Sequence, residues 1–226
     1  MLDVRSITRS RWGGRASRAM ARLNARHPWS HNDHFHGWIL SRLPDRRRRA
    51  LDVGCGQGAL LAALGSSLDE AVGIDTDAGM RAAAAARCSR LPSVRVSDTP
   101  LAAVEGPFDV VTMVAVLHHL DVGAALHDVR RLLAPGGRFL CVGLAPPDSP
   151  LDLAWDLASI VTNPLIGFVK HPRPSLAPAA PPPYPVADPV LSFSEIQALA
   201  EAVLPGARMR HRLGFRHTLE WTAPGR

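Results

Sequence analysis

The chain has 226 residues, enough to bury the core of one α/β domain with additions. Its formal charge is +6, but Lys170 is the only lysine, and an arginine excess beside abundant alanine and 20 prolines is the composition that a GC-rich genome produces. We therefore expect no nucleic-acid partner, and the absence of an apolar run of about 18 residues predicts no membrane-spanning helix.

The cysteines and the N-terminal residues indicate the cellular compartment in which the protein is expected. Cys55, Cys88 and Cys141 are an odd, scattered set, which is typical of reduced thiols and not of a disulfide framework. The N-terminal region contains arginines but no apolar segment of the kind that a secretory signal needs. We expect a cytoplasmic protein that is a monomer or a homodimer.

Residues 1–45 are expected to form an N-terminal arm and a lid helix, ahead of a main domain at 46–226. The segment 27–43 concentrates four histidines, two tryptophans and a phenylalanine. Ser30, Asn32 or Asp33 is suited to cap a helix whose apolar residues pack onto the main domain.

The histidines of this segment allow three interpretations. His31, His34 and His36 with Asp33 resemble a metal site, but further ligands are not evident in the sequence, and we expect no metal. The rings can instead pack and hydrogen-bond around Trp38. In the third interpretation the segment closes over a ligand, and His34 or His36 faces the substrate.

A glycine-rich turn opens the main domain. Residues 50–53 are predicted to form a strand, and Gly54, Gly56 and Gly58 follow it before an apolar helix at 59–64. Glycine removes side chains where a backbone turns tightly and a ligand approaches it, and the helix directs free N–H groups at that ligand. A turn without a ligand is the alternative, since short glycine motifs often occur by chance.

The next predicted strand, at 71–74, ends at Asp75, which lies 21 residues after Gly54. An acidic residue at about this distance from the glycine turn binds a ribose diol in α/β nucleotide-binding units. Asp52, inside the first strand, would repel a pyrophosphate but suits a ligand that carries an ammonium group. The two carboxylates therefore favour a cationic nucleoside ligand over a nicotinamide dinucleotide.

The following segments continue the alternation of helix and strand. A helix is expected at 76–87 and a strand at 94–97. An almost continuous apolar run at 110–116 is typical of a buried parallel strand. His118 and His119 follow at its carboxyl end, where ligands bind in open α/β sheets.

A helix, a strand and an insertion come next. The helix at 124–133 is expected to stop at a Pro-Gly-Gly turn, 135–137, before a strand at 138–144. Residues 146–190 are apolar and helical at first and then proline-rich, and we expect them to be an insertion that walls the substrate side.

A capping box and two short strands complete the pattern. Ser192, with Glu195 three residues later, is expected to cap a helix that ends near Val203. Residues 207–213 and 217–222 alternate well enough to be the last two strands.

Four segments of the chain carry motifs in a fixed order. They read LDVGCGQG at 51–58, VGID at 72–75, FDVVTMVAVLHHL at 108–120 and LAPGGRFL at 133–140. In these motifs, over residues 48–144, the chain resembles the class I S-adenosylmethionine-dependent methyltransferases of the small-molecule type. The resemblance implies a Rossmann-like α/β fold, with a seven-stranded, mostly parallel sheet, the last strand antiparallel, helices on both faces and an insertion after strand 5.

The resemblance also implies the reaction. A methyl group would pass from S-adenosyl-L-methionine, by in-line displacement, to an oxygen or nitrogen atom of a small molecule such as a secondary metabolite, with S-adenosyl-L-homocysteine as product. The protein would mainly orient the acceptor and exclude water. A neutral histidine suits removal of the acceptor's proton at pH 7, and the candidates are His34, His36, His118 and His119.

The cofactor-binding residues follow from the family's motifs. Asp75 would bind the ribose, Asp98 would accept from the adenine amino group, and Asp52 would act on the ammonium side. Asp98 can also cap the next turn, and Met80 can belong to the core. The full predicted set is Asp52, Gly54, Cys55, Gly56, Asp75, Thr76, Met80, Asp98, Thr99 and Val114.

Other functions stay open. An RNA methyltransferase is supported only by charge, and the chain lacks the Asn/Asp-Pro-Pro-Tyr/Phe and Pro-Cys signatures of nucleobase methyltransferases. A protein that keeps the fold and binds the cofactor without methylating is a second alternative. A nicotinamide oxidoreductase is the third, although the later motifs do not fit it.

Overall fold

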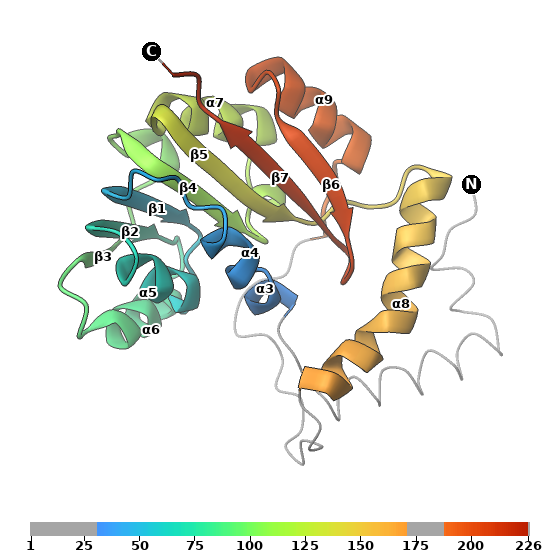
Figure 1. Ribbon diagram of the computed structural model, residues 1–226, viewed down its shortest axis with the longest axis horizontal. Helices are drawn as coiled ribbons and strands as arrows, with labels where there is room; N and C mark the ends of the chain where they lie inside the picture. Colours follow the sequence, from blue (N-terminus) through green and yellow to red (C-terminus); the bar gives the residue numbers. More distant parts are fainter. Residues whose placement is uncertain (1–30, 171–187, 226) are drawn as a thin grey trace.

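The structure, a computed structural model, describes residues 31–170 and 188–225. The arm predicted at 1–26 and most of the proline-rich part of the insertion lie outside the described residues. Within the described part, a seven-stranded sheet carries helices on both faces (Figure 1).

The strand order of the sheet is β3-β2-β1-β4-β5-β7-β6. The first five strands are parallel, β7 is antiparallel to both of its neighbours, and β6 forms an edge. The mostly parallel sheet with an antiparallel last strand, predicted from the sequence, is therefore confirmed. The strands are β1 (Arg49–Val53), β2 (Glu70–Ile74), β3 (Val94–Ser97), β4 (Phe108–Val114), β5 (Leu133–Gly143), β6 (Arg208–Arg212) and β7 (Arg216–Thr222).

The helices lie on both sides of this sheet (Figure 1). They are α3 (His31–His34), α4 (His36–Leu40), α5 (Ala59–Gly65), α6 (Ala78–Cys88), α7 (Val122–Leu132), α8 (Pro150–Lys170) and α9 (Phe193–Val203). Two short 3-10 helices, η1 (Leu101–Ala103) and η2 (Leu117–His119), follow β3 and β4.

Two apolar cores hold these layers together. Successive side chains of a strand point to opposite faces, so Leu51 of β1 belongs to one core and Ala50 to the other. The core that contains Leu51 includes residues of α7 and α9, and the core that contains Ala50 includes residues of α4, α5 and α6. The central strands β1 and β4 are thereby buried on both faces, as their apolar sequences predict.

Local signals account for where three helices begin. The carboxylates of Asp77 and Asp121 each accept a hydrogen bond at 2.8 Å from the backbone N–H three residues later, and so cap α6 and α7. Ser192 and Glu195 form the predicted capping box at the start of α9.

The cap predicted for the N-terminal helix is wrong within the described residues. Helix α4 begins after Phe35 without a side-chain cap. Asn32 and Asp33 do not cap it because they belong to a separate short helix, α3. Ser30, the other predicted cap, lies outside the described residues.

The turn predicted at 135–137 lies inside strand β5 and not before it: Gly136 has a φ of +75°, and the register with β4 shifts there. Strand β5 begins at Leu133, directly after α7, and runs through these residues with an irregular register. The N–H of Gly136 donates to the carbonyl oxygen of Ala223 at 3.1 Å, and the N–H of Ala223 donates to Gly137 at 2.8 Å. Pairing with the end of the chain thus holds this bend within the sheet.

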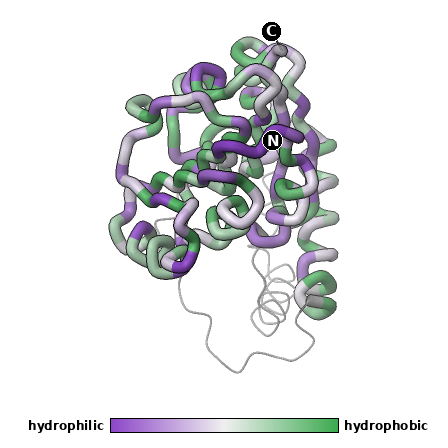
Figure 2. Tube along the Cα trace, turned by 60° about the vertical axis from the view of Figure 1, so that its left-hand side comes forward, coloured by the Kyte–Doolittle hydropathy of each residue, from purple (hydrophilic) through white to green (hydrophobic). Residues whose placement is uncertain are grey.

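Helix α8 stands apart from the sheet, with hydrophobic residues along its length (Figures 1 and 2). Leu165 and Val169 expose 61% and 77% of their surface. The Ser159 hydroxyl accepts the N–H of Gly214 at 3.1 Å, which ties α8 to the loop between β6 and β7. No described helix, α8 included, is long and apolar enough to cross a membrane.

We expect Gly58→Ala to destabilise the protein far more than Gly56→Ala. Both glycines have positive φ, +77° and +52°, which costs an L residue about 1 kcal/mol. A Cβ at Gly58 would also lie 2.9 Å from the backbone of Ala84 in α6, whereas nothing lies within 4 Å at Gly56. The clash should add about 2 kcal/mol. Urea unfolding measures both losses, and equal losses would contradict the packing argument.

Candidate active site

The turn after β1 is held against the end of β2. The N–H groups of Gly54 and Cys55 both donate to the carbonyl oxygen of Ile74, at 2.7 and 3.0 Å. A Cβ on Gly54 would lie 2.2 Å from Val116, so no larger residue fits there. At Gly56 the space is empty, and this is the point of the turn where a ligand can approach the backbone.

Asp75 lies directly after β2 and is fixed beside this point. Its Oδ2 accepts the N–H of Gly56 and its Oδ1 accepts the N–H of Asp77, both at 2.9 Å. The side chain is half-buried, and each carboxylate oxygen has a further lone pair. Asp75 can therefore accept hydrogen bonds from a diol while the backbone holds it in place.

Asp52 lies deeper than Asp75. It is 3% exposed, and its Oδ1 accepts a hydrogen bond from the Thr112 hydroxyl at 2.7 Å. Burial raises the pKa of Asp52 to about 7; the Thr112 hydrogen bond opposes this rise, and the charge of Asp75 adds to it. Asp52 can thus influence a cationic ligand through its charge more than through direct contact.

Three other predicted cofactor residues lie in the turn after β1, in the segment after β2 and in α6, and they differ in exposure. Cys55 and Met80 are buried, and Thr76 is exposed. The Sγ atom of Cys55 packs against Gly73, so this residue can offer a ligand only its backbone. Burial raises the pKa of Cys55 to about 12, which keeps it a neutral thiol.

The remaining predicted cofactor residues follow β3 or end β4. Asp98 is exposed and lies 3.8 Å from the Arg81 guanidinium. Thr99 is half-buried, and its hydroxyl shares a 2.6 Å hydrogen bond with Ser97. Val114, half-buried, ends β4. Because parallel strands end at the same edge of a sheet, the predicted cofactor residues gather along that edge.

The chain after β4 brings His118 to the same edge. Ala115 has a φ of +56°, which is strained for a residue with a Cβ, and its N–H donates to Val142 at 2.8 Å. His118 is half-buried in η2, and its Nδ1 has no hydrogen-bond partner among the described residues. Burial, with the charges of nearby His119 and Arg216 acting in the same direction, lowers the pKa of His118 to about 4, so the ring is neutral at pH 7.

The predicted histidines of the N-terminal segment lie on its two short helices. His34 is exposed, and His36 is half-buried, with its Nε2 3.7 Å from the Asp33 carboxylate. Burial lowers the pKa of His36 although this carboxylate opposes the shift. The Asn32 side chain accepts from Arg216 at 3.1 Å and so ties α3 to the start of β7. Among the described side chains, no three metal-ligating groups converge on one point.

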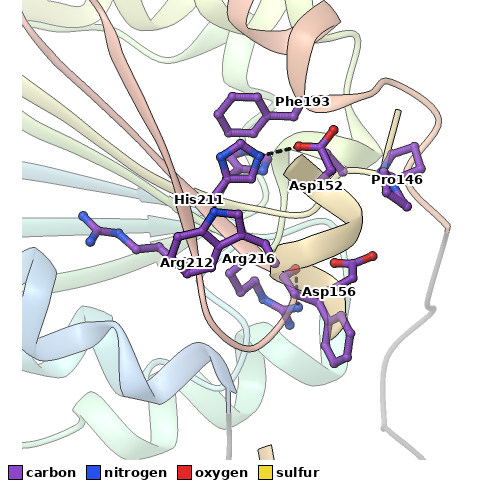
Figure 3. A pocket seen from close by; sticks show the side chains of 12 residues that line it. Pro146, Asp152, Asp156, Phe193, His211, Arg212 and Arg216 are labelled. Carbon is purple, nitrogen blue, oxygen red and sulfur yellow. Dashed lines mark hydrogen bonds and ion pairs between the residues drawn. The ribbon is translucent and has the colours of Figure 1, made fainter. Parts of the chain in front are cut away.

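A pocket beside this edge combines residues that the sequence did not bring together (Figure 3). His211 of β6 lies between Phe193 and Trp155, with ring centroids 3.8 and 6.0 Å away, and its Nε2 hydrogen-bonds Asp152 of α8. Burial alone would raise the pKa of Asp152, but hydrogen bonds from Ser149 and its neighbours outweigh it and hold this pKa well below its ordinary value.

His217 of β7 lines the same pocket. It is 2% exposed, and its Nε2 has no hydrogen-bond partner in the described part of the chain. The ring packs on Gly143, where a Cβ would lie 2.4 Å from Nε2. Burial, with smaller contributions from nearby His211, Arg216 and His118, lowers the pKa of His217 to about 4. His217 is therefore neutral and close to both other histidines.

Sequence reasoning missed His211, His217 and Asp152 as site residues. One signal was available, because the two histidines are direct partners in the β6–β7 pair, and the predicted hairpin could have placed them together. No pattern shows that α8 returns to this hairpin. The pocket has a volume of about 30 Å³, room for about one water molecule, so it admits the edge of a ligand and not a whole ring.

The fold and this edge define a class of protein. The strand order, the glycine turn after β1 and the acidic residue after β2 are the architecture of class I methyltransferases. A solved structure described as a SAM-dependent methyltransferase from Aquifex aeolicus has the same fold, with a TM-score of 0.54 at 16% identity over 92% of this chain and 96% of that one.

Sequence comparisons identify the family. The family described as "Methyltransferase domain" matches residues 51–141. The uncharacterized methyltransferase Rv0089 of Mycobacterium tuberculosis is 32% identical over 202 residues, which cover 87% of this chain and 98% of that protein. The demethylmenaquinone methyltransferase of Mycolicibacterium paratuberculosis is 34% identical over 114 residues, 46% of this chain and 49% of that protein. The chain belongs to the S-adenosylmethionine-dependent methyltransferases.

Asp52→Asn is expected to remove a pH dependence of folding. The pKa of Asp52 rises from 3.8 to about 7 on folding, so the folded state loses stability as the pH rises through this range, by up to about 4 kcal/mol. Asparagine can still accept from Thr112 and carries no charge. In urea unfolding without ligand, the free energy of unfolding of the variant should rise relative to that of the parent above pH 7 but not near pH 4. Parallel dependences of the two free energies on pH would contradict the assignment.

Proposed function

We propose that this methyltransferase transfers the methyl group of S-adenosyl-L-methionine to an oxygen or nitrogen atom of a small molecule. One observation carries the proposal: the carboxyl edge of β1, β2 and β4. There the open backbone of Gly56, the fixed carboxylate of Asp75 and the neutral, half-buried ring of His118 follow three neighbouring strands.

The residues of the turn fit this cofactor. The empty space at Gly56 leaves room for a close ligand, and Asp75 has lone pairs for ribose hydroxyls. The buried Asp52 has a pKa close to neutrality, and a nearby ammonium group would favour its ionised form. When bound, S-adenosylmethionine supplies an electrophilic methyl group on a positively charged sulfur.

The other predicted residues take the remaining parts of the cofactor in this proposal. Asp98 and Thr99 would lie at the adenine, and Thr76 would lie beside the ribose. Val114 would contact the methionine part, and Cys55 would contribute its backbone N–H. Met80 is buried and would support the adenine side from the core.

The acceptor is assigned to the side of His118 that faces His217, a residue that lines the pocket described above. Both His118 Nδ1 and His217 Nε2 are buried without a partner among the described residues, which costs about 1–3 kcal/mol for each group. An acceptor hydroxyl or N–H can satisfy such a nitrogen, since both rings are neutral at pH 7. A small acceptor agrees with the relative that is named for methylating demethylmenaquinone.

We assign His118 as the group that takes the acceptor's proton. Among the predicted histidines, His34 and His119 are exposed, and His36 lies on a separate helix. His118 follows β4 directly, and the neighbouring Val116 packs on Gly54 of the cofactor turn. Its low pKa keeps the ring neutral throughout the physiological range, and a neutral ring has one nitrogen that can accept a proton or a hydrogen bond.

Calorimetric titration of the full chain tests the cofactor. We expect micromolar binding of S-adenosylmethionine and no heat with NADH. Asp75→Asn should weaken the binding about tenfold or more, because charge-assisted hydrogen bonds to the ribose are lost. Asp69→Asn, an exposed carboxylate just before β2, is the matched control and should bind like the parent. Heat with NADH alone would overturn the assignment.

Product formation tests the reaction and the base. The protein would be incubated with S-adenosylmethionine and a panel of hydroxylated aromatic compounds and amines, with S-adenosylhomocysteine as readout. With an acceptor in hand, His118→Gln should lower kcat about 100-fold, whereas His119→Gln should leave it unchanged. Unchanged turnover in His118→Gln would refute the base, and cofactor binding with no product from any acceptor would favour a non-methylating protein.

A further inference from the structure

A second pocket lies on the other face of the edge strand β6. Arg208, Arg210 and Arg212 alternate along this strand with Met209 and His211. Alternate residues of a strand share a face, so the three arginines project to one side. Met209 packs against the core that contains Leu51, and His211 lies in the pocket of Figure 3.

Residues of three elements converge on the side of the arginines. The pocket that they form, here called the arginine pocket, has a volume of about 200 Å³, which is room for several water molecules or a phosphate-sized group. It is lined by Arg42, Arg208, Arg210, Arg212, Thr218 and Glu220.

The charges of the arginine pocket are not balanced. Glu220 alone is acidic among its lining residues, and it already pairs with Arg42 at 3.3 Å and lies 4.0 Å from Arg138. Within the described part of the chain, Arg208 and Arg210 form no ion pair. Four lining arginines against one glutamate leave three positive charges.

Arg212 shows the electrostatic cost of this crowding. Its Nε donates to the Thr218 hydroxyl at 3.1 Å. Burial lowers the pKa of Arg212, the charges of Arg210 and Arg42 lower it further, and Glu220 offsets only part of the shift. Cations held together in this way are stabilised when an anion binds between them.

We propose that the arginine pocket binds a small ligand that carries two or more linked phosphate groups. The net charge of +3 is more than a ligand with a single carboxylate would balance. Guanidinium groups bind phosphate oxygens through paired N–H bonds. Arg208, Arg210 and Arg212 line one pocket from the same face of β6, and their long side chains can converge on a chain of linked phosphates. The inference is independent of the methyl acceptor and of the cofactor site.

A purely structural role is the competing explanation. Charged side chains on an edge strand prevent pairing with another molecule, and β6 is an edge. That role requires charge along the strand, but it does not require Arg42, which comes from the segment after α4 and reaches the same pocket. Ligand binding separates the two explanations.

Calorimetric titration of the full chain with sodium tripolyphosphate at low ionic strength is the test. We expect one binding site, weakened about tenfold or more in Arg208→Ser/Arg210→Ser, because each arginine supplies charge-assisted hydrogen bonds. Arg208→Lys/Arg210→Lys keeps the charge without the planar fork, so its loss should be smaller. The matched control, Arg90→Ser/Arg95→Ser, removes two exposed arginines at the opposite edge, near β3, and should bind like the parent.

Three results would overturn the proposal. Absence of binding by the parent would leave the arginines as protection of the edge strand. Equal weakening in the control would show a general effect of net charge. Binding of a short single-stranded RNA with a steep salt dependence, but not of tripolyphosphate, would indicate an extended nucleic-acid surface. Unchanged urea unfolding and S-adenosylmethionine binding of the variants would show that the fold and the cofactor site are intact.

Discussion

Two N–H groups that share one carbonyl oxygen set the geometry of the candidate active site. Gly54 and Cys55 both donate to Ile74, so the turn after β1 is registered against the end of β2, and Asp75 meets the backbone of Gly56. The same turn positions the chain after β4, because Val116 packs where Gly54 has no side chain. One backbone clamp therefore aligns the cofactor side with the segment that carries His118.

Several buried polar groups at this edge lower the stability of the fold while no ligand is bound. Asp52 is a carboxylate enclosed in the sheet, and the nitrogens left unpaired on His118 and His217 are buried in the described part of the chain. A sequence selected for stability alone would avoid such groups. Their concentration along one edge of the sheet is the physical reason for locating function there.

Features encoded by neighbouring residues could be predicted from the sequence, and features encoded by distant ones could not. The glycine turn, the buried strands and the Ser192–Glu195 capping box depend on local patterns, and the structure contains each of them. The irregular start of β5 depends on pairing with Ala223, which a local turn signal cannot reveal. The His211–Asp152 contact joins β6 to α8, and the arginine pocket joins β6 to the segment after α4, so both follow from tertiary packing.

The buried cysteines have a consequence for the chemistry of oxidation. All three are free thiols enclosed by the fold, and burial raises the pKa of Cys55 and of Cys141 to about 12. Since the thiolate is the form that reacts with peroxides and alkylating reagents, the folded protein should be nearly inert to both. Cys55 lies in the cofactor turn itself, so its oxidation requires local opening of this turn. Thiol labelling would then report the opening of this part of the fold, and an oxidising environment would leave the site intact for as long as it stays closed.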